Sequence, residues 1–262
     1  MDHSHSPIGA AAGEAAKTGF VVVIPAYGEA ATIGGIVAGC RNCLAVIVVD
    51  DGSADATAAA AAAAGALVVR NERNLGKGAS LVRGFQKAMH MAPGAAWVVT
   101  LDGDGQHRPA DIPFLIACAA EDRIVIGSRR VGGRLGAETP RARYVANRVA
   151  DFWVSWASGH PVDDSQSGFR VYPMGVLRAL RAGQGLARGF GFESEMLIAA
   201  GALGVRTVAV PIASIYGGAL RRASHFRPIV DIGKIVVMLG GRLLRRGMYP
   251  AGLWRVVKSF RR

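Results

Sequence analysis

The chain has 262 residues, about half of them hydrophobic, which is enough to bury the core of one large domain. No uncharged apolar run reaches about 18 residues, so the sequence predicts no membrane-spanning helix, and three cysteines are too few for a disulfide framework or a closed zinc site. The net charge of +12 is uneven, because eleven Lys and Arg face one Asp from residue 221 onward, whereas the preceding 220 residues hold 20 basic and 18 acidic groups. The basic character therefore belongs to a C-terminal appendage.

The order of predicted elements indicates an α/β protein. Residues 1–18 lack the basic start and apolar block of a secretory signal, so they predict a disordered leader. Continuous apolar and β-branched runs predict buried strands at 19–25, 44–49, 66–70, 95–100 and 124–128. Helices are expected between them, including an alanine-rich one that ends at residue 65 and others at 78–91 and 109–119. This alternation predicts an open parallel sheet that binds ligands at its carboxyl edge.

Acidic side chains follow the predicted strands at that edge. Glu29 follows the first strand, Asp50 and Asp51 the second, and Asp102 and Asp104 the fourth. An Asp-x-Asp on a tight glycine turn offers hard oxygen ligands to Mg²⁺ or Mn²⁺ and leaves positions open for water and phosphate. The same pattern is also common in solvated turns, so its meaning depends on the neighbouring motifs.

A glycine-flanked lysine lies at the start of the helix predicted at 78–91. Lys77 lies between Gly76 and Gly78 at a helix start, where a mobile cation and free backbone amides favour an anion. No G-x-G-x-x-G follows the first strand and no P-loop occurs in the sequence. A nucleotide would therefore be held by carboxylates and a metal.

Seven segments occur in a recognisable order: IPAYGEAATI, VIVVDDGSADAT, NLGKGAS, LDGDGQH, IGSR, DSQSGFRVY and GFGFESEML. Together they resemble the family 2 glycosyltransferases, in the dolichol- or polyprenyl-phosphate sugar synthase branch. The resemblance implies a GT-A fold over residues 19–226, a Rossmann-like, mainly parallel sheet with helices on both faces. It also implies a GDP- or UDP-sugar donor, Mg²⁺ or Mn²⁺, a lipid-phosphate acceptor, and transfer with inversion at the anomeric carbon.

The resemblance carries over to individual positions. Asp102 and Asp104 would hold the metal, and Gln106 would face the sugar or the acceptor. Arg129 would approach the donor, since a guanidinium suits phosphate better than an ammonium does. The residues expected around the donor are Pro25, Tyr27, Glu29, Asp50, Asp51, Lys77, Asp102, Gly103, Arg221 and Arg222. One departure is Gly28, where the family usually has Asn.

The acceptor side falls on the segment that carries Asp164 and Arg170. With a phosphate acceptor, which is already ionised, Asp164 would orient the acceptor, bind metal or cap its loop. With a hydroxyl acceptor it would be the general base. Glu193 and Glu195 begin a later helix, where carboxylates are favourable in any protein, and the family pattern points to Glu193.

Residues 227–262 predict basic amphipathic helices. The segment 229–244 is too rich in apolar residues for a solvated helix and too short to span a membrane. Trp254 and Phe260, which follow it, could anchor in the headgroup region of a membrane. An anionic membrane on its cytoplasmic face is therefore the expected partner. The alternatives are packing on the core or on a second copy in a homodimer. Nucleic acid is a less favoured partner, because no recognised nucleic-acid-binding motif accompanies the basic residues.

Two other functions compete with sugar transfer. Nucleotidyl transfer also uses carboxylate-bound Mg²⁺ on such a sheet, but its usual Gly-rich first loop with Arg or Lys is absent after Pro25. A non-catalytic basic module that binds membranes or nucleic acid would not need the acidic motifs. The sequence therefore favours a metal-dependent glycosyltransferase.

Overall fold

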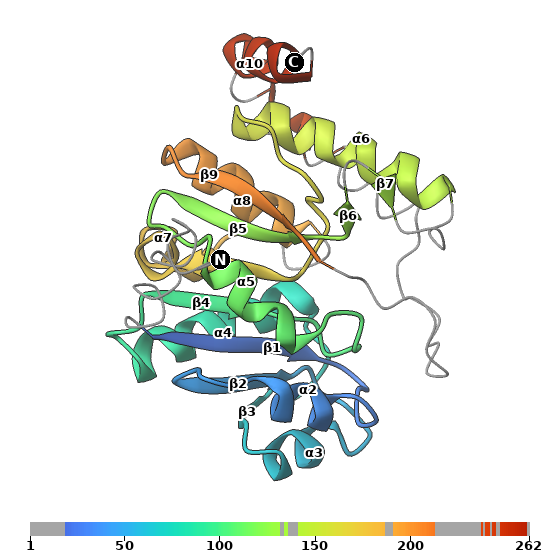
Figure 1. Ribbon diagram of the computed structural model, residues 1–262, viewed down its shortest axis with the longest axis vertical. Helices are drawn as coiled ribbons and strands as arrows, with labels where there is room; N and C mark the ends of the chain where they lie inside the picture. Colours follow the sequence, from blue (N-terminus) through green and yellow to red (C-terminus); the bar gives the residue numbers. More distant parts are fainter. Residues whose placement is uncertain are drawn as a thin grey trace, which may run out of the picture.

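A seven-stranded mixed sheet forms the centre of the protein. The computed structural model describes residues 19–131, 134–135, 141–186, 191–212, 237, 239–241, 243–244 and 247–260. The strand order is β3-β2-β1-β4-β8-β5-β9, and a separate ribbon joins β6 and β7 (Figure 1). The strands are β1 (Phe20–Ala26), β2 (Ala45–Asp50), β3 (Leu67–Arg70), β4 (Trp97–Thr100), β5 (Arg123–Ser128), β6 (Arg130–Val131), β7 (Arg134–Leu135), β8 (Arg170–Pro173) and β9 (Arg206–Pro211).

Helices connect and cover these strands. The α-helices are α2 (Ile33–Gly39), α3 (Thr57–Ala63), α4 (Lys77–Met91), α5 (Ile112–Ile116), α6 (Arg141–Ser158), α7 (Met174–Ala179), α8 (Phe192–Ala202) and α10 (Pro250–Phe260). Two short 3-10 turns are η1 (Pro109–Asp111) and η2 (Arg181–Gly183). The alanine-rich segment is the helix α3, as the sequence predicted.

The central strands of the sheet are buried on both faces, as the continuous apolar runs predicted. Along β1, Val21 and Val23 face one core with Phe85 of α4, whereas Val22 and Ile24 face a second core under α2 and α5. Successive side chains of a strand point to opposite faces, so a strand covered on both sides has no polar positions. The GT-A-like arrangement of a mainly parallel sheet between two helical layers is confirmed.

The strand β8 departs from the predicted parallel order. It lies between β4 and β5 and runs antiparallel to both, while β1, β2, β3 and β4 pair in parallel. Its four residues follow the segment DSQSGF. This segment therefore passes the rim just before the chain enters the sheet as β8. This insertion places residues 163–169 beside the carboxyl end of β4.

The C-terminal helix packs on α6. The indole Nε1 of Trp156 donates to the carbonyl oxygens of Met248 and Tyr249 at 3.1 and 3.2 Å, and Val256 of α10 is fully buried. Helical structure also covers the described residues between 237 and 244. Arg221, Arg222 and residues 227–236 lie outside the described residues, as does the predicted leader. The predicted domain boundary at residue 226 stays a prediction.

Candidate functional site

The carboxyl ends of β1, β2 and β4 meet at one rim of the sheet. The parallel register pairs Ala26 with Asp50 and Val23 with Thr100, so the loops after these strands begin side by side. Asp51 and Asp102 both lie there and are linked through one segment. The Gly76 N–H donates to Asp51 at 2.8 Å, and Lys77, the next residue, binds Asp102. The rim predicted from strand ends is therefore one connected site.

Asp51 shapes the loop that carries Lys77. Its carboxylate is buried and accepts hydrogen bonds from Asn71 Nδ2 at 2.6 Å, Leu75 N at 2.9 Å and Gly76 N at 2.8 Å. Because these bonds use both oxygens, Asp51 fixes the start of α4 in addition to its predicted contact with a base. That contact stays a prediction.

Asp50 faces the interior. It is fully buried, accepts the Ser53 N–H at 3.1 Å and lies 3.1 Å from Arg70 Nε. Asp50 therefore ends its strand at the rim but exposes no side-chain surface there, and its contacts with Ser53 and Arg70 hold the loop after β2. Adjacent residues at a strand end point to opposite faces, so one of the pair had to turn inward.

The loop after β1 is pinned to the loop after β2. Gly28 N donates to Ser53 Oγ at 2.9 Å, and Glu29 N donates to Thr57 Oγ1 at 2.8 Å. Gly28 has φ of +68°, a region that glycine adopts freely and Asn tolerates best among the other residues. The exchange of Asn for Gly at this position therefore preserves the backbone shape. Tyr27 is 45% exposed and faces solvent at the rim.

Gly103 lets the Asp-x-Asp loop lie against the loop after β1. A side-chain carbon there would lie 3.3 Å from the Ala26 Cβ, 3.4 Å from the Glu29 Cγ and 3.4 Å from the buried Pro25 carbonyl. The Thr32 hydroxyl donates to the Gly103 carbonyl at 2.6 Å. The backbone of the motif is thus held against the loop after β1 and the start of α2.

Lys77 bridges two carboxylates from distant segments. Its ammonium lies 2.7 Å from Asp102 Oδ1 and 2.7 Å from Glu193 Oε1. Burial alone would lower the pKa of Lys77, but the two carboxylates raise it above its ordinary value. Burial likewise opposes ionisation of Asp102, yet Lys77, His107 and Arg129 hold the pKa of Asp102 below its usual range. Lys77 and Asp102 are therefore both charged near neutral pH.

Asp104 is the exposed member of the motif. Its Oδ1 accepts the Gln106 N–H at 3.0 Å, which closes the turn. Partial burial and the nearby negative charge of Asp102 raise the pKa of Asp104. A divalent cation would relieve this repulsion, and paired carboxylate oxygens are the ligands that Mg²⁺ and Mn²⁺ prefer.

The donor set fits a cation that is shared with a substrate. Across the described ranges no group of three or more His, Cys, Asp and Glu converges as a closed metal site. Asp102 and Asp104 would therefore hold the ion on one side and leave its remaining positions to water and phosphate. This matches the open coordination expected of a cation that binds a diphosphate.

Arg129 and Asp164 form a buried bidentate pair. Arg129 Nε and Nη2 donate to the two Asp164 oxygens at 3.0 and 2.7 Å, and Arg129 N donates to Oδ2 at 2.9 Å. Both residues are less than a tenth exposed, and Asp164 adopts φ of +50°. The sequence placed Arg129 on the donor side and Asp164 on the acceptor side, whereas the structure joins them. These contacts favour orientation of Arg129 over the general-base role for Asp164.

Three further residues, His107, Gly168 and Glu193, lie at the rim beside the predicted donor and cation residues. His107 is buried against Phe169, with ring centroids 5.4 Å apart, and burial lowers the pKa of His107. Gly168 lies so close to the Lys77–Asp102 pair that a Cβ would fall within 2.7 Å of three of its atoms. Glu193 is the second carboxylate that binds Lys77. Their motifs were visible in the sequence, but the contacts depend on β8, which the sequence did not predict.

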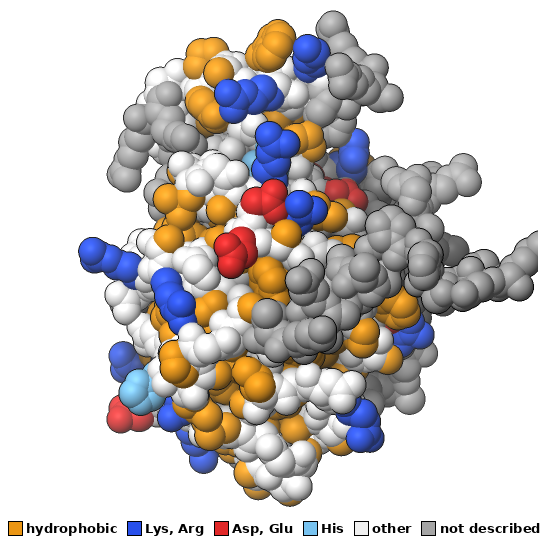
Figure 2. All heavy atoms as spheres, turned by 60° about the vertical axis from the view of Figure 1, so that its left-hand side comes forward, with side chains coloured by type: hydrophobic (Ala, Val, Ile, Leu, Met, Phe, Trp, Pro, Cys, Tyr) orange, Lys and Arg blue, Asp and Glu red, His pale blue; other side chains and the backbone are white. Residues whose placement is uncertain are grey.

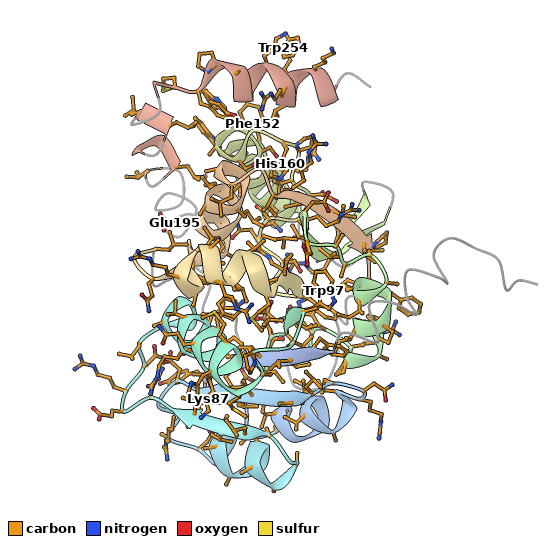
Figure 3. All side chains as sticks on the ribbon, turned by 90° about the vertical axis from the view of Figure 1, so that its left-hand side faces the viewer. Lys87, Trp97, Phe152, His160, Glu195 and Trp254 are labelled. Carbon is orange, nitrogen blue, oxygen red and sulfur yellow. The ribbon has the colours of Figure 1, made fainter. Side chains whose placement is uncertain are left out.

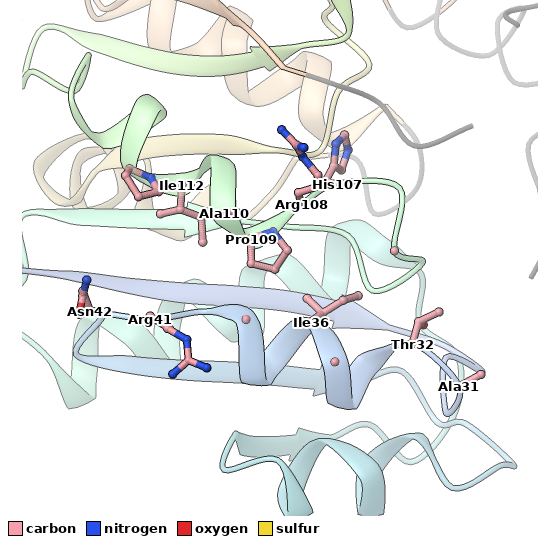
Figure 4. Close-up of a pocket in the computed structure, with 14 residues that line it drawn as sticks. Ala31, Thr32, Ile36, Arg41, Asn42, His107, Arg108, Pro109, Ala110 and Ile112 are labelled. Carbon is pink, nitrogen blue, oxygen red and sulfur yellow. The ribbon is translucent and has the colours of Figure 1, made fainter. Parts of the chain in front are cut away.

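A groove lies behind the Asp-x-Asp loop. It has a volume of about 730 Å³ and runs between α2 and the segment from His107 to Pro113, with Ile36 and Pro109 among the lining residues (Figure 4). No rim carboxylate is among the described residues that line it. The groove therefore shares one wall with the motif and does not contain the charged site.

Comparisons with known proteins show which sequences this chain resembles. The sequence profile described as Glycosyl transferase family 2 matches residues 21–176. An undecaprenyl-phosphate mannosyltransferase of Micrococcus luteus is 29% identical over 200 residues, which cover 73% of this chain and 82% of that protein. A UDP-N-acetylglucosamine–dolichyl-phosphate N-acetylglucosaminyltransferase of Methanococcus voltae is 34% identical over 216 residues, which cover 74% and 85%.

Solved structures extend the similarity to the fold. The glucosyl-3-phosphoglycerate synthase from Mycobacterium tuberculosis, in complex with Mg²⁺ and uridine diphosphate, is 25% identical. It superposes with a TM-score of 0.62 over 94% of this chain and 85% of that one. The two relatives from Micrococcus luteus and Methanococcus voltae are named for sugar transfer to undecaprenyl phosphate and dolichyl phosphate, which is the branch that the seven motifs indicated. On the profile match, the relatives and the rim together, the chain belongs to glycosyl transferase family 2.

Proposed function

We propose that this protein transfers a sugar from a nucleotide-diphosphate sugar to a polyprenyl phosphate or a similar lipid phosphate. The observation that carries the proposal is the Lys77–Asp102–Glu193 bridge beside Asp104 at the carboxyl rim. It combines two candidate cation ligands with a lysine at a helix start, which is a favourable place for a diphosphate. The lipid acceptors named for the relatives support the acceptor class.

A divalent cation held by Asp102 and Asp104 would neutralise charge on the leaving nucleoside diphosphate. Lys77 and the first amides of α4 would orient the same phosphates, and the loop after β1 would border the nucleoside. Such preorganised charge is usually the largest contribution to catalysis. The Mg²⁺ and uridine diphosphate bound to the Mycobacterium tuberculosis synthase support this arrangement.

The acceptor phosphate supplies its own nucleophile. Because a phosphate monoester is ionised near neutral pH, its oxygen can attack the anomeric carbon without losing a proton to the enzyme. The bond to the nucleoside diphosphate breaks on the opposite face, so the sugar is inverted and no enzyme-bound sugar forms. Asp164 would hold Arg129 in place for this step through the bidentate pair.

The donor and the reaction class are tested together. Incubation with a panel of UDP- and GDP-sugars, polyprenyl phosphate and Mn²⁺ should release nucleoside diphosphate with one donor. A parallel incubation with UTP or GTP and sugar 1-phosphates would release pyrophosphate if the protein were instead a nucleotidyltransferase. Neither product with any donor would refute both enzymatic functions and leave the non-catalytic binding module.

The C-terminal helix offers a surface for an anionic membrane. Trp254 and Val257 of α10 are 64% and 40% exposed, and Lys258 Nζ lies 4.9 Å from the Trp254 ring centroid. Val237 and Leu244 are also exposed. Hydrophobic and basic side chains share this end of the molecule in Figure 2, and Trp254 points away from the body in Figure 3. This mixture suits the headgroup region, which supports a peripheral position on the cytoplasmic face.

The membrane surface would bring the lipid acceptor to the catalytic domain. In the part of the chain that the structure describes, no helix combines the length and hydropathy that a membrane crossing requires. Val256 fixes α10 on the body by its buried side, so the exposed side of the same helix remains for the lipid. A second copy of the chain is the alternative partner for this surface.

A further inference from the structure

Arg170 is a fully buried arginine that binds backbone carbonyls. Its Nε donates to the Ser167 carbonyl at 2.8 Å, and its Nη2 donates to the Ser165 carbonyl at 2.6 Å. Its Nη1 donates to the Glu193 carbonyl at 2.8 Å and to the Tyr172 hydroxyl at 3.2 Å. Among the described residues no carboxylate lies within salt-bridge distance of this guanidinium. The side chain therefore ties two separate segments of backbone together.

This use of a charge is costly and therefore informative. A buried guanidinium loses its hydration, and only a full set of well-aligned hydrogen bonds offsets that loss. An apolar side chain would fill the same space without the penalty. Arg170 provides what an apolar residue cannot, a planar fork that fixes residues 163–169 and the first turn of α8 in one geometry.

The tied backbone carries the charged groups of the rim. Glu193, whose carbonyl Arg170 holds, binds Lys77 through its side chain at 2.7 Å, and Lys77 binds Asp102 at 2.7 Å. The other tied segment also carries Asp164, the partner of the arginine at the end of β5. One buried guanidinium thus connects the acceptor-side segment with the candidate cation ligand.

We propose that Arg170 is a positioning residue for sugar transfer, which acts by fixing Glu193 so that Lys77 and Asp102 keep their places at the rim. This role rests on the proposed function. The Arg170 side chain has no exposed surface and binds four internal acceptors, so it acts on the rim through the backbone that it holds and not through contact with a substrate.

The conservative variant Arg170→Lys tests the proposal. Lysine keeps the charge but cannot reproduce the planar fork. We expect kcat to fall roughly tenfold or more, as happens when groups that orient ligating side chains are lost, and the Mn²⁺ concentration for half-maximal activity to rise. The matched control is Arg178→Lys on α7, where the guanidinium also binds a carbonyl, that of Pro93 at 2.6 Å, but away from the rim. Its kinetic constants should equal those of the wild type.

A double-mutant cycle separates positioning from general stabilisation. If Arg170 acts through Glu193, Arg170→Lys should cost little further activity once Glu193→Gln is present. Equal losses in both backgrounds would overturn the proposal, as would wild-type kinetics and Mn²⁺ dependence in Arg170→Lys. If Arg170→Lys does not fold, Tyr172→Phe removes one acceptor of the fork and should produce a smaller loss with the same dependence on Glu193.

Nucleotide binding makes the test independent of turnover. The thermal shift produced by UDP or GDP with Mn²⁺ should be smaller in Arg170→Lys than in Arg178→Lys. A wild-type chain that binds nucleotide but transfers no sugar would refute the proposed function, while this comparison would still decide the role of Arg170. A chain that neither binds nor transfers would refute both.

Discussion

At the scale of single residues, the Asp102 carboxylate would have to bind both Lys77 and a divalent cation. Lys77 lies 2.7 Å from one of its oxygens, and a divalent cation bound with Asp104 would need the same carboxylate. The Lys77 side chain is about a quarter exposed, so its ammonium also has access to a phosphate that binds at the rim. The geometry of this carboxylate should therefore matter more to activity than to folding.

Gly168→Ala tests that separation. The new Cβ would lie 2.5 and 2.6 Å from the Asp102 oxygens and 2.7 Å from Lys77 Nζ, which are the ends of side chains that can move. We expect a loss of activity of about tenfold, in the range seen when orienting contacts are disturbed, with little change in Tm. The control Gly175→Ala, where a Cβ meets nothing within 4 Å, should keep full activity. Equal activity of the two variants would contradict this role for Gly168.

The acid stability of the protein should depend on Lys77. Burial would raise the pKa of Asp102, but Lys77 and its neighbours lower it, so this carboxylate stabilises the fold above its unfolded pKa and loses that contribution as the pH falls through the lower folded value. In Lys77→Met the acid-unfolding midpoint, followed by circular dichroism below about pH 4, should move to higher pH. Arg123→Met, which breaks the exposed pair with Asp122, should leave the midpoint nearly unchanged.

At the scale of elements, the helix α4, which begins at Lys77, lies very close to the sheet. A Cβ on Gly84 would lie 2.3 Å from Val23 Cγ1 of β1 and 3.3 Å from Val49 Cγ2 of β2. Gly84→Ala should therefore lower the free energy of unfolding by about 1–3 kcal/mol, as overpacking does, although alanine is the better helix former. Gly35→Ala in α2, which has open space, should be neutral or stabilising. Urea unfolding measures both.

The elements predictable from sequence are those whose pattern is local. The runs that form β1, β2 and β4 are apolar without interruption, so their burial and their rim-facing ends could be predicted. The strand β8 has only four residues, and its antiparallel place between β4 and β5 depends on pairing across 70 positions of chain, from Thr100 to Arg170. The pairs that β8 creates, Arg129 with Asp164 and Arg170 with Glu193, were therefore not predictable from spacing.

At the scale of the whole molecule, charge and catalysis lie in different parts of the chain. From residue 221 onward eleven basic residues face one acid, whereas the first 220 residues are nearly neutral. The rim sits within the neutral part, whereas the exposed Trp254 lies on α10 at one end of the molecule (Figure 3). This separation suits an enzyme whose basic segment binds a surface while its sheet binds a nucleotide.

Vesicle binding should follow that division. The protein should float with vesicles that contain phosphatidylglycerol, less with pure phosphatidylcholine, and less again as salt is raised, since each basic residue near an anionic surface contributes about 1 kcal/mol. Trp254→Glu should weaken flotation, whereas Leu203→Glu, an exposed position after α8, should not. Flotation that is equal for both variants would refute the membrane role of α10.

The central claim is that Asp102 and Asp104 hold a cation that sugar transfer requires. Its most direct test is the rate of nucleoside diphosphate release in wild type, Asp104→Ala and the distant control Asp122→Asn, each with Mn²⁺ and with EDTA. The account predicts that EDTA stops the wild type and the control, and that Asp104→Ala loses at least about 100-fold with Mn²⁺ present while its Tm is unchanged. Full activity of Asp104→Ala, or of the wild type in EDTA, would contradict it.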